Sequence, residues 1–296
     1  QHECLERFVT ACKPCSAVIC CRAAPSQKAL MVRMVLKKYG KIGLAIGDGL
    51  NDVSMIQEAK VGVGILGKEG SQASRSADYS IPSFRHLKRL LCVYGRYSLL
   101  RTAKFVQYSF YKNMTLVFCQ IFFSFFTLYS GQTILESLVI TFYNIIFTII
   151  PPFLFGLFDK DVDEDTIESD PEIYKEFTTF TLIGAKTFAL WVLQAVYHAT
   201  IIFFFMYAIQ MYGDSTLSFQ GYVSDDLWLF SSTISFLVHY TVNFKSVLEM
   251  GYYPVITIVG LFLSIISTLI FHVIYSAIYI ANDSSTYTAI YQIMCM

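Results

Sequence analysis

Two kinds of hydrophobic pattern divide this sequence near residue 100. Before that point, short β-branched runs alternate with amphipathic segments; after it, most of the chain is apolar. The first pattern is typical of an α/β domain. The second contains windows that reach the roughly 20 apolar residues needed by a membrane-spanning helix. The sequence therefore predicts a small α/β module followed by an all-α polytopic membrane domain.

Strands and helices alternate in the first part of the chain. The β-branched runs predict strands at 17–22, 41–47, 61–66 and 78–81. The amphipathic segments between them predict helices at 26–39, 52–59 and 71–77. Apolar strands that alternate with helices indicate a parallel sheet covered on both faces.

Five windows in the second part are long and apolar enough to cross a bilayer. They are 105–128, 134–158, 186–211, 227–249 and 254–280, and a truncated sixth begins at about 287. Lys and Arg stud the segment before the first window, which places that end in the cytosol. We therefore expect a cytosolic α/β module at 1–83, a stalk helix at 84–104 and a membrane domain at 105–296. The Asn282 sequon then lies on the outer side, close to the membrane, and its glycosylation is left open.

Composition agrees with a membrane protein. The chain is 55% hydrophobic and 15% charged, whereas soluble domains are about 25% charged. Lys+Arg and Asp+Glu balance at 22 each, so no net charge favours nucleic acid as a partner. The eight cysteines are irregularly spaced, which favours reduced thiols in the cytosolic module. Because the chain begins with Gln1 and carries no signal peptide, we interpret it as a carboxy-terminal fragment.

The strongest chemical signal lies where a predicted strand ends in Gly47-Asp48-Gly49. Asp48 and Asp52 would lie at the carboxyl edge of the sheet, where α/β folds bind ligands, and carboxylates suit Mg²⁺. Upstream, Arg22 and Lys28 are placed to hold a phosphoryl group. The alternatives are an Asp-Gly turn capped by Asp52 or Asn51, and a surface role for Lys28.

The first predicted span contains no carboxylate, which disfavours a cation pump. It contains instead Lys112 and Asn113, about two turns in. A buried cation suits an anionic lipid headgroup, although Lys112 could instead extend back to the cytosolic interface.

Two prolines interrupt the second predicted span. Pro151 and Pro152 cannot donate backbone hydrogen bonds, so we expect a kink or opening near residues 147 and 148. Broken helices in transporters often line the transport path. Asn144 and Thr148 could contact a headgroup there, or could hydrogen-bond between helices instead.

These motifs together resemble one protein family. The runs ICCRAAPSQKA, AIGDGLNDVSMIQEA, VGVGILGKEGSQASRSADYSIP, SFYKN, YNIIFTIIPP, GLFDKDV and VNFKSVLE cover nearly the whole chain. They resemble the type IV, phospholipid-flipping branch of the P-type ATPases. The resemblance implies a haloacid-dehalogenase-like (Rossmann-like) phosphorylation domain, present here only in part, and a cycle through an aspartyl-phosphate. Its cofactors would be Mg²⁺ and ATP.

The resemblance also implies roles for particular residues. Asp48 and Asp52 would hold Mg²⁺, Lys28 would contact the phosphoryl group, Arg22 and Asn51 would line the nucleotide and phosphate site, and Lys112 would serve lipid translocation. Leu50 replaces the usual Ala, and Ala23-Ala24 replace the usual pair before the proline. The DKTG segment, the nucleotide-binding and actuator domains and the first four spans are absent. This fragment alone is therefore not expected to hydrolyse ATP.

The function that fits these features is ATP-driven flipping of phospholipids, with aminophospholipids favoured, from the outer or luminal leaflet to the cytosolic one. An accessory glycosylated β-subunit and a plasma-membrane or Golgi/endosomal location are expected with it. The alternatives are a P-type cation or polyamine pump, and a non-catalytic membrane module of a larger signalling protein. A full-length sequence without DKTG would favour the second alternative.

Overall fold

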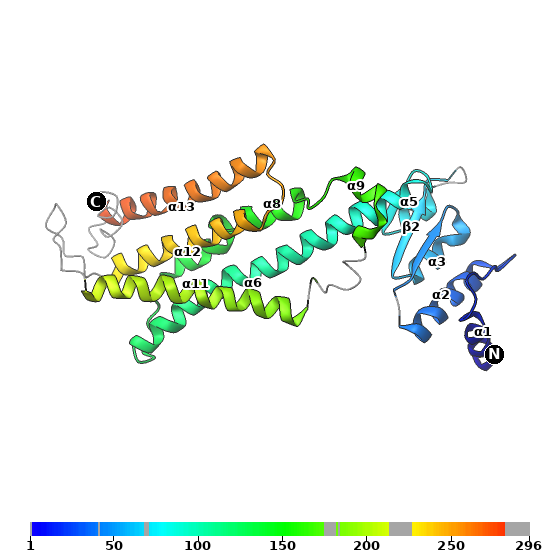
Figure 1. Ribbon diagram of the computed structural model, residues 1–296, viewed down its shortest axis with the longest axis horizontal. Coiled ribbons are helices and arrows are strands. Elements are labelled where there is room, and N and C mark those ends of the chain that lie inside the picture. Colours follow the sequence, from blue (N-terminus) through cyan, green and yellow to red (C-terminus); the bar gives the residue numbers. More distant parts are fainter. Residues whose placement is uncertain are drawn as a thin grey trace. The chain divides into compact units, whose positions relative to one another are not determined.

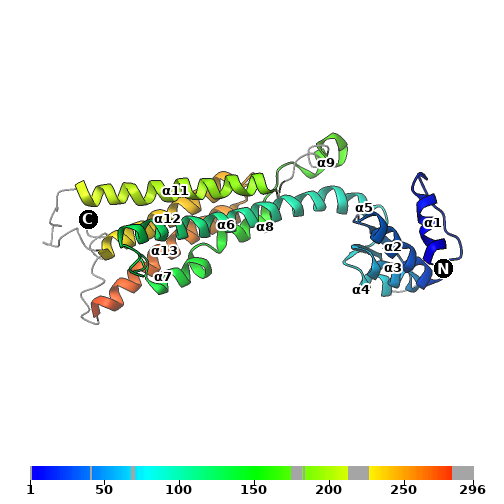
Figure 2. The ribbon, with the colours of Figure 1, turned by 90° about the horizontal axis from the view of Figure 1, so that it is seen from below.

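The computed structural model describes residues 2–40, 42–67, 71–174, 182, 184–212 and 227–281. The chain divides into two compact units, Gln1–Val93 and Tyr94–Met296, each treated separately below (Figures 1 and 2). The predicted span from about residue 287 and the Asn282 sequon lie outside the described residues.

The first unit is built on a three-stranded parallel sheet with strand order β1-β2-β3, as the alternating pattern predicts. Its elements, in chain order, are α1 (His2–Cys12), α2 (Pro25–Tyr39), β1 (Leu44–Gly47), the short helix η1 (Leu50–Asp52), α3 (Val53–Glu58), β2 (Val61–Ile65), α4 (Gln72–Ser76), β3 (Tyr79–Ile81) and α5 (His86–Arg89). A π-helical turn, η2 (Leu90–Tyr94), follows α5.

Two glycines in β2 let helices approach the sheet closely. A Cβ atom on Gly64 would lie 2.5 Å from Ser74 Cα in α4, and one on Gly62 would lie 2.6 Å from the Ile56 side chain in α3. Only glycine fits such distances. Helices α3 and α4 therefore pack directly against the central strand β2, in which Val63 is fully buried.

The predicted strand at 17–22 is wrong, and α1 was not predicted. Residues 17–22 pair with no strand in the described part of the chain, and Ile19 is 87% exposed. A strand requires a neighbour for its backbone N–H and C=O groups. The β-branched run satisfies the intrinsic preference for a strand, but it has no partner strand among the described residues.

The second unit consists of long helices. Its elements are α6 (Gly95–Phe126), α7 (Ser137–Phe142), the π-helical turn η3 (Tyr143–Phe147), α8 (Ile150–Phe158), α9 (Glu164–Ser169), the short helix η4 (Pro171–Tyr174), α11 (Ala185–Tyr212), α12 (Leu227–Glu249) and α13 (Val255–Ala281). Helix α6 packs along α11, α8 lies against α6 and α13, and α12 contacts α11 and α13 (Figures 1 and 2).

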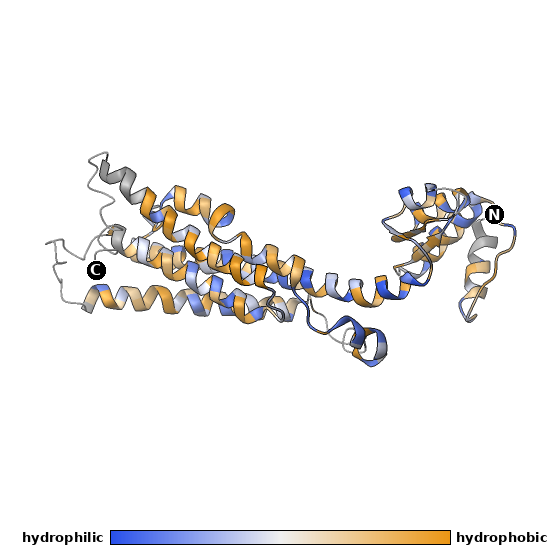
Figure 3. Ribbon diagram, turned by 90° about the horizontal axis from the view of Figure 1, so that it is seen from above, coloured by the Kyte–Doolittle hydropathy of each residue, from blue (hydrophilic) through white to orange (hydrophobic). Residues whose placement is uncertain are grey.

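Three helical segments in the described residues are long and apolar enough to cross a membrane: Ser137–Phe158, Ala185–Met211 and Val255–Ile274. Many of their large apolar side chains are exposed, as lipid-facing residues are. Figure 3 shows that these helices are coloured mostly as hydrophobic. Helices α6 and α12 are as long but carry more polar residues. Their assignment as spans stays a prediction.

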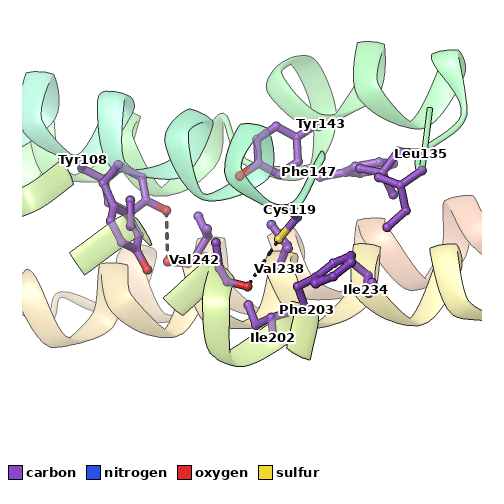
Figure 4. Close-up of a cluster of buried hydrophobic side chains, with 14 of the residues drawn as sticks. Tyr108, Cys119, Leu135, Tyr143, Phe147, Ile202, Phe203, Ile234, Val238 and Val242 are labelled. Atoms are coloured by element: carbon purple, nitrogen blue, oxygen red, sulfur yellow. Dashed lines mark hydrogen bonds between the residues drawn. The ribbon is translucent and has the colours of Figure 1, made fainter. Parts of the chain in front are cut away.

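The core of the second unit is rich in aromatic residues. Tyr108, Tyr143 and Phe147 are fully buried, and Tyr143 and Phe147 come from the π-helical turn η3. Figure 4 draws part of this cluster, in which the Tyr108 hydroxyl donates to the carbonyl oxygen of Val242 at 3.2 Å. The core therefore fixes η3 between α6 and α12.

Candidate functional site

The first candidate site is the loop that follows β1. Lys28 Nζ, from the first turns of α2, lies 2.7 Å from Asp52 Oδ1, so the structure brings together two of the predicted residues. Both side chains remain partly accessible, at 33% and 15%. Asp48 is exposed at the carboxyl end of β1, and its carboxylate has no hydrogen bond or ion pair with any described residue.

The glycines around Asp48 do not adopt positive φ, and two glycines near it, Gly47 and Gly67, allow close packing instead. Gly49 has an extended φ of −122°, and Gly47 is not among the described residues with positive φ. A Cβ atom on Gly47 would lie 2.3 Å from Asp52 Cβ, and one on Gly67 would lie 2.8 Å from the Asp48 carbonyl oxygen. Glycine therefore lets the Asp52 side chain and the segment after β2 pack against this loop.

The donor set at this edge fits Mg²⁺ bound together with a phosphate. Mg²⁺ is commonly held by one or two carboxylates, with waters and phosphate oxygens completing the octahedron. Asp48 is free of protein partners in the described chain, and only one Asp52 oxygen is paired with Lys28. No group of three or more metal-binding side chains occurs in the part of the chain described.

The structure does not bring Arg22 or Asn51 into contact with these residues. Both are exposed, and no hydrogen bond in the described part of the chain joins either one to Asp48 or Asp52. Arg22 also has a φ of 54°, in the left-handed region that non-glycine residues rarely adopt. Their predicted contact with nucleotide and phosphate stays a prediction.

The second candidate site is a helix break at residues 148 and 149. The chain leaves η3 at Phe147 and starts α8 at Ile150, with prolines in the first turn of α8. The expected interruption is therefore confirmed, and it consists of two residues that are not part of a regular helix. The Thr148 amide donates to the Tyr143 carbonyl oxygen at 3.1 Å, and the Thr148 hydroxyl donates to the same oxygen at 2.6 Å.

Lys112 is buried at this break rather than extended to an interface. Its side chain is 6% exposed, and Nζ donates to Thr148 Oγ1 at 2.9 Å and to the Thr148 carbonyl oxygen at 3.3 Å. The Tyr143 hydroxyl donates back to the Lys112 carbonyl oxygen at 2.7 Å. The Lys112 ammonium thus meets the oxygen atoms of Thr148 inside the buried part of the helical unit.

The other two residues predicted for the substrate path lie apart from this contact. Asn113 is exposed and donates to the Ser109 carbonyl oxygen of its own helix at 3.0 Å. Asn144 is exposed and has no hydrogen bond with a described residue. The structure therefore joins Lys112 to Thr148 but leaves the two asparagines on outward faces.

Sequence reasoning missed a third contributor to the break, Ser264 of α13. Its hydroxyl is fully buried and donates to the Phe147 carbonyl oxygen at 2.6 Å. The prolines signal that a carbonyl near Phe147 needs a new donor. Nothing in the local sequence says which of the many helix serines supplies it.

A cluster of hydrogen-bonded polar residues at the end of α8 was also not predicted from the sequence. Asp159 is nearly buried and accepts from Lys104 Nζ at 2.6 Å and from the Gly251 amide at 2.8 Å. Lys104 also donates to the Glu249 carbonyl oxygen at 2.9 Å, and Arg101 donates to the Asp159 carbonyl oxygen at 2.7 Å. We call these five residues the Asp159 cluster; it ties α6 to the ends of α8 and α12.

Next to this cluster, the segment after α8 is bound a second time to α6. Arg96 is buried and pairs with Asp161 at 2.5 Å, and the Tyr97 hydroxyl donates to the Val162 carbonyl oxygen at 2.6 Å. Burial and the nearby carboxylates of Glu164, Asp161 and Asp163 raise the pKa of Tyr97. The positively charged first part of α6 thus holds the acidic segment that follows α8.

The described chain thus combines an α/β unit, in which Lys28 contacts Asp52 after β1, with a helical unit that contains three segments long and apolar enough to cross a membrane. Comparison with known proteins gives the family. Residues 74–296 match the family described as "Phospholipid-translocating P-type ATPase C-terminal". This chain belongs to that family, and the resemblance drawn from the motifs is confirmed.

Curated relatives agree over nearly the whole chain. The human "Phospholipid-transporting ATPase IH" is 38% identical over 93% of this chain and 24% of its own length. The yeast "Phospholipid-transporting ATPase DRS2" (Saccharomyces cerevisiae) is 40% identical over 97% of this chain and 21% of its own length. The human "Phospholipid-transporting ATPase IC" is 41% identical over 88% of this chain and 20% of its own length. The chain thus spans a fifth to a quarter of these relatives.

Proposed function

We propose that the protein to which this chain belongs is an ATP-driven phospholipid flippase. It moves phospholipids, with aminophospholipids as the favoured class, from the outer or luminal leaflet to the cytosolic leaflet through an aspartyl-phosphate cycle. The chain supplies the distal part of the phosphorylation domain and the later membrane helices.

The observation that carries this proposal is the buried ammonium of Lys112 at the break between η3 and α8. An amine in an apolar environment is unfavourable unless it meets hydrogen-bond acceptors. Here Thr148 supplies two acceptor oxygens, and an ammonium has three N–H donors. The remaining donor suits the phosphate oxygen that every phospholipid headgroup carries.

The charge pattern of the helices separates a lipid from a metal cation as cargo. In the described parts of α6, α7, α8, α11, α12 and α13, the only carboxylate is Glu249, at the very end of α12. Desolvated hard cations require several oxygen ligands within the membrane. A membrane core with one buried lysine and no carboxylate supports an anionic cargo group.

The small parallel sheet of the first unit is consistent with the proposal that this unit is part of a haloacid-dehalogenase-like domain. Strand β1 lies at the edge of the sheet order, so its outer backbone groups have no strand partner in the described chain. Val18, Ile19 and Leu44 are exposed apolar residues near the start of the chain. Further strands from the upstream part of the protein would pair with β1 and give residues 17–22 a place in the sheet.

Asp48 and Asp52 would hold Mg²⁺ in this domain, and the bound ion would neutralise charge on the phosphoryl group. Lys28 is oriented by its 2.7 Å contact with Asp52 and can present the rest of its ammonium to a phosphoryl oxygen. Arg22 and Asn51 are exposed, and in this proposal they would contact the nucleotide and the phosphate. The phosphorylated aspartate itself lies outside this chain.

In this proposal α6 and α12 cross the membrane together with the three most apolar helical segments, which makes five spans. The α/β module is then cytosolic, and a stalk helix at 84–104 leads into the first span. The protein would then be a multi-pass component of the plasma membrane or of Golgi/endosomal membranes. An accessory glycosylated β-subunit is part of the proposal by family analogy.

The test uses the purified full-length protein in lipid nanodiscs with Mg²⁺ and ATP. ATP hydrolysis should rise with one or more phospholipids from a panel of serine, ethanolamine and choline headgroups. Asp48→Asn should abolish phosphoenzyme turnover, whereas Glu58→Gln, on the exposed Arg33 pair, should leave it unchanged.

Lys112→Gln should raise the phospholipid concentration for half-maximal stimulation by at least about tenfold, because a hydrogen bond from a charged donor contributes roughly 1.5–3 kcal/mol. The matched control is Lys186→Gln at the exposed start of α11. Stimulation by cations or polyamines without any by phospholipid would refute the lipid cargo. Absence of any ATP-dependent phosphoenzyme would instead favour a non-catalytic membrane module.

A further inference from the structure

We infer that Ser264 is a positioning residue that holds the η3–α8 break in the shape that presents Thr148 and Lys112 to the cargo. The inference rests on the proposed function and extends it to a residue on α13. It follows from a count of backbone hydrogen bonds around the two prolines.

In a continuous α-helix, each carbonyl oxygen accepts from the amide four residues ahead. The carbonyls of Phe147 and Thr148 would therefore accept from residues 151 and 152. Both are prolines, which have no amide hydrogen. The two prolines thus deprive two consecutive carbonyl oxygens of their helical donors.

Side chains from two other helices replace these donors, one for each carbonyl. Lys112 of α6 donates to the Thr148 carbonyl oxygen at 3.3 Å, and Ser264 of α13 donates to the Phe147 carbonyl oxygen at 2.6 Å. Phe147 and Ser264 are both fully buried, so water does not reach this site. Loss of the Ser264 hydroxyl would leave a buried carbonyl without a partner, which is strongly unfavourable.

The Ser264 hydroxyl also lies 3.1 Å from Asn243 Oδ1, on α12. A hydroxyl has a single hydrogen, so it serves one of these two acceptors at a time. Ser264 can therefore release Phe147 and remain satisfied by Asn243 when α8 moves relative to α13. The Phe147 carbonyl oxygen has no such substitute among the described residues, so it depends on the Ser264 hydroxyl for a donor.

The position of the Phe147 carbonyl affects the proposed cargo site because Phe147 is next to Thr148 in the chain. Phe147 and Thr148 are successive residues, so a shift of the Phe147 carbonyl displaces the Thr148 oxygens that bind Lys112. Ser264 does not touch the ammonium or the cargo. It acts through the backbone of the break, and its removal should weaken cargo binding rather than the phosphorylation chemistry.

The experiment compares Ser264→Ala, Ser264→Thr and Ser267→Ala in the full-length protein. Ser264→Thr keeps a hydroxyl at the same position. Ser267 is the matched control because its hydroxyl donates only to the Ser264 carbonyl of its own helix, at 2.8 Å. Two quantities are measured: the phospholipid concentration for half-maximal ATPase stimulation, and the phosphoenzyme level formed from ATP without lipid.

For Ser264→Ala we expect the half-maximal concentration to rise about tenfold, with the phosphoenzyme level unchanged. Ser264→Thr should stay within about threefold of the wild type, and Ser267→Ala within about twofold. An unchanged half-maximal concentration for Ser264→Ala would overturn the inference. So would a parallel fall in phosphoenzyme and maximal rate at constant half-maximal concentration, because that pattern indicates general structural damage.

A second measurement separates this inference from the proposed function. Amide hydrogen exchange across residues 143–150, followed by mass spectrometry, should be faster in Ser264→Ala than in the wild type and unchanged in Ser267→Ala. If no phospholipid stimulates the wild type, the proposed function fails while the exchange result still decides the role of Ser264. Equal exchange in all variants would refute that role whatever the cargo is, and this holds even if one variant is too unstable for ATPase assays.

Discussion

The Asp159 cluster gives the most quantitative prediction, through the substitution Asp159→Asn. Asp159 is 4% exposed as a side chain, and Lys104 Nζ lies 2.6 Å away with 26% exposure. The change keeps the shape and volume of the side chain and removes its charge. An amide oxygen can still accept from the Gly251 amide, so the main loss is the ion pair itself.

The size of the loss can be worked from the distance. At 2.6 Å and an effective dielectric constant near 20, the Coulomb attraction is about 6 kcal/mol before desolvation. Removing one partner of a buried pair typically costs about 3–5 kcal/mol. Because Lys104 keeps some contact with water and its bond to Glu249, we take about 3 kcal/mol. For a unit of this size, that corresponds to a melting temperature lower by roughly 6–12 °C.

The assay is thermal unfolding of the full-length protein in detergent, followed by intrinsic fluorescence. The matched control is Asp163→Asn, because Asp163 is exposed in the same acidic segment and its carboxylate has no hydrogen bond with a described residue. The control should shift the melting temperature by less than about 2 °C. An Asp159→Asn protein that melts together with the Asp163→Asn protein would contradict the buried ion pair.

Three further predictions concern other parts of the chain. Gly47→Ala forces a Cβ atom to within 2.3 Å of Asp52 Cβ, so phosphoenzyme formation should fall at least about tenfold; normal phosphorylation would contradict the close approach. Pro151→Ala restores an amide donor for the break, so melting temperature should rise by about 2–4 °C while lipid-stimulated ATPase falls; unchanged turnover would argue against a role for the break. The pKa of Tyr97 is raised in the folded protein, so its hydrogen bond to Val162 stabilises the protein below about pH 10. This stabilisation is lost as the pH rises from there through the pKa of Tyr97 in the folded state. Melting temperature in Tyr97→Phe should therefore fall less between pH 10 and 11 than in the wild type, and equal slopes would refute this.

Local features were predictable from the sequence because their causes are local. The parallel strands β1, β2 and β3 follow from β-branched runs between amphipathic helices, and the break follows from two adjacent prolines. The strand predicted at 17–22 failed for the opposite reason, since pairing depends on a neighbouring strand, and the described residues provide none for this segment. Helix α1 carries no start signal strong enough to have been recognised.

The sequence identified several residues of the candidate sites, but it did not show which residues contact one another. The Gly47-Asp48-Gly49 run located the first site, yet the reason for its glycine is the 2.3 Å approach of Asp52, which only coordinates reveal. Burial of Lys112 against Thr148 decided between two positions that the sequence left open. Ser264 could not have been found, because it joins Phe147 across 117 residues and resembles the other serines of its helix.

The substitution of side chains for backbone donors at the break also bears on how the protein is made. A transmembrane helix normally satisfies its own backbone as soon as it forms, but the segment from α7 to α8 cannot. Ser264 is translated 117 residues after Phe147, which at about 5–20 residues per second is a delay of roughly 6 to 23 seconds. During this interval the nascent segment carries an unsatisfied carbonyl, so its final shape is set only when α13 arrives. We therefore expect the final shape of the break to form only after α13 has been synthesised.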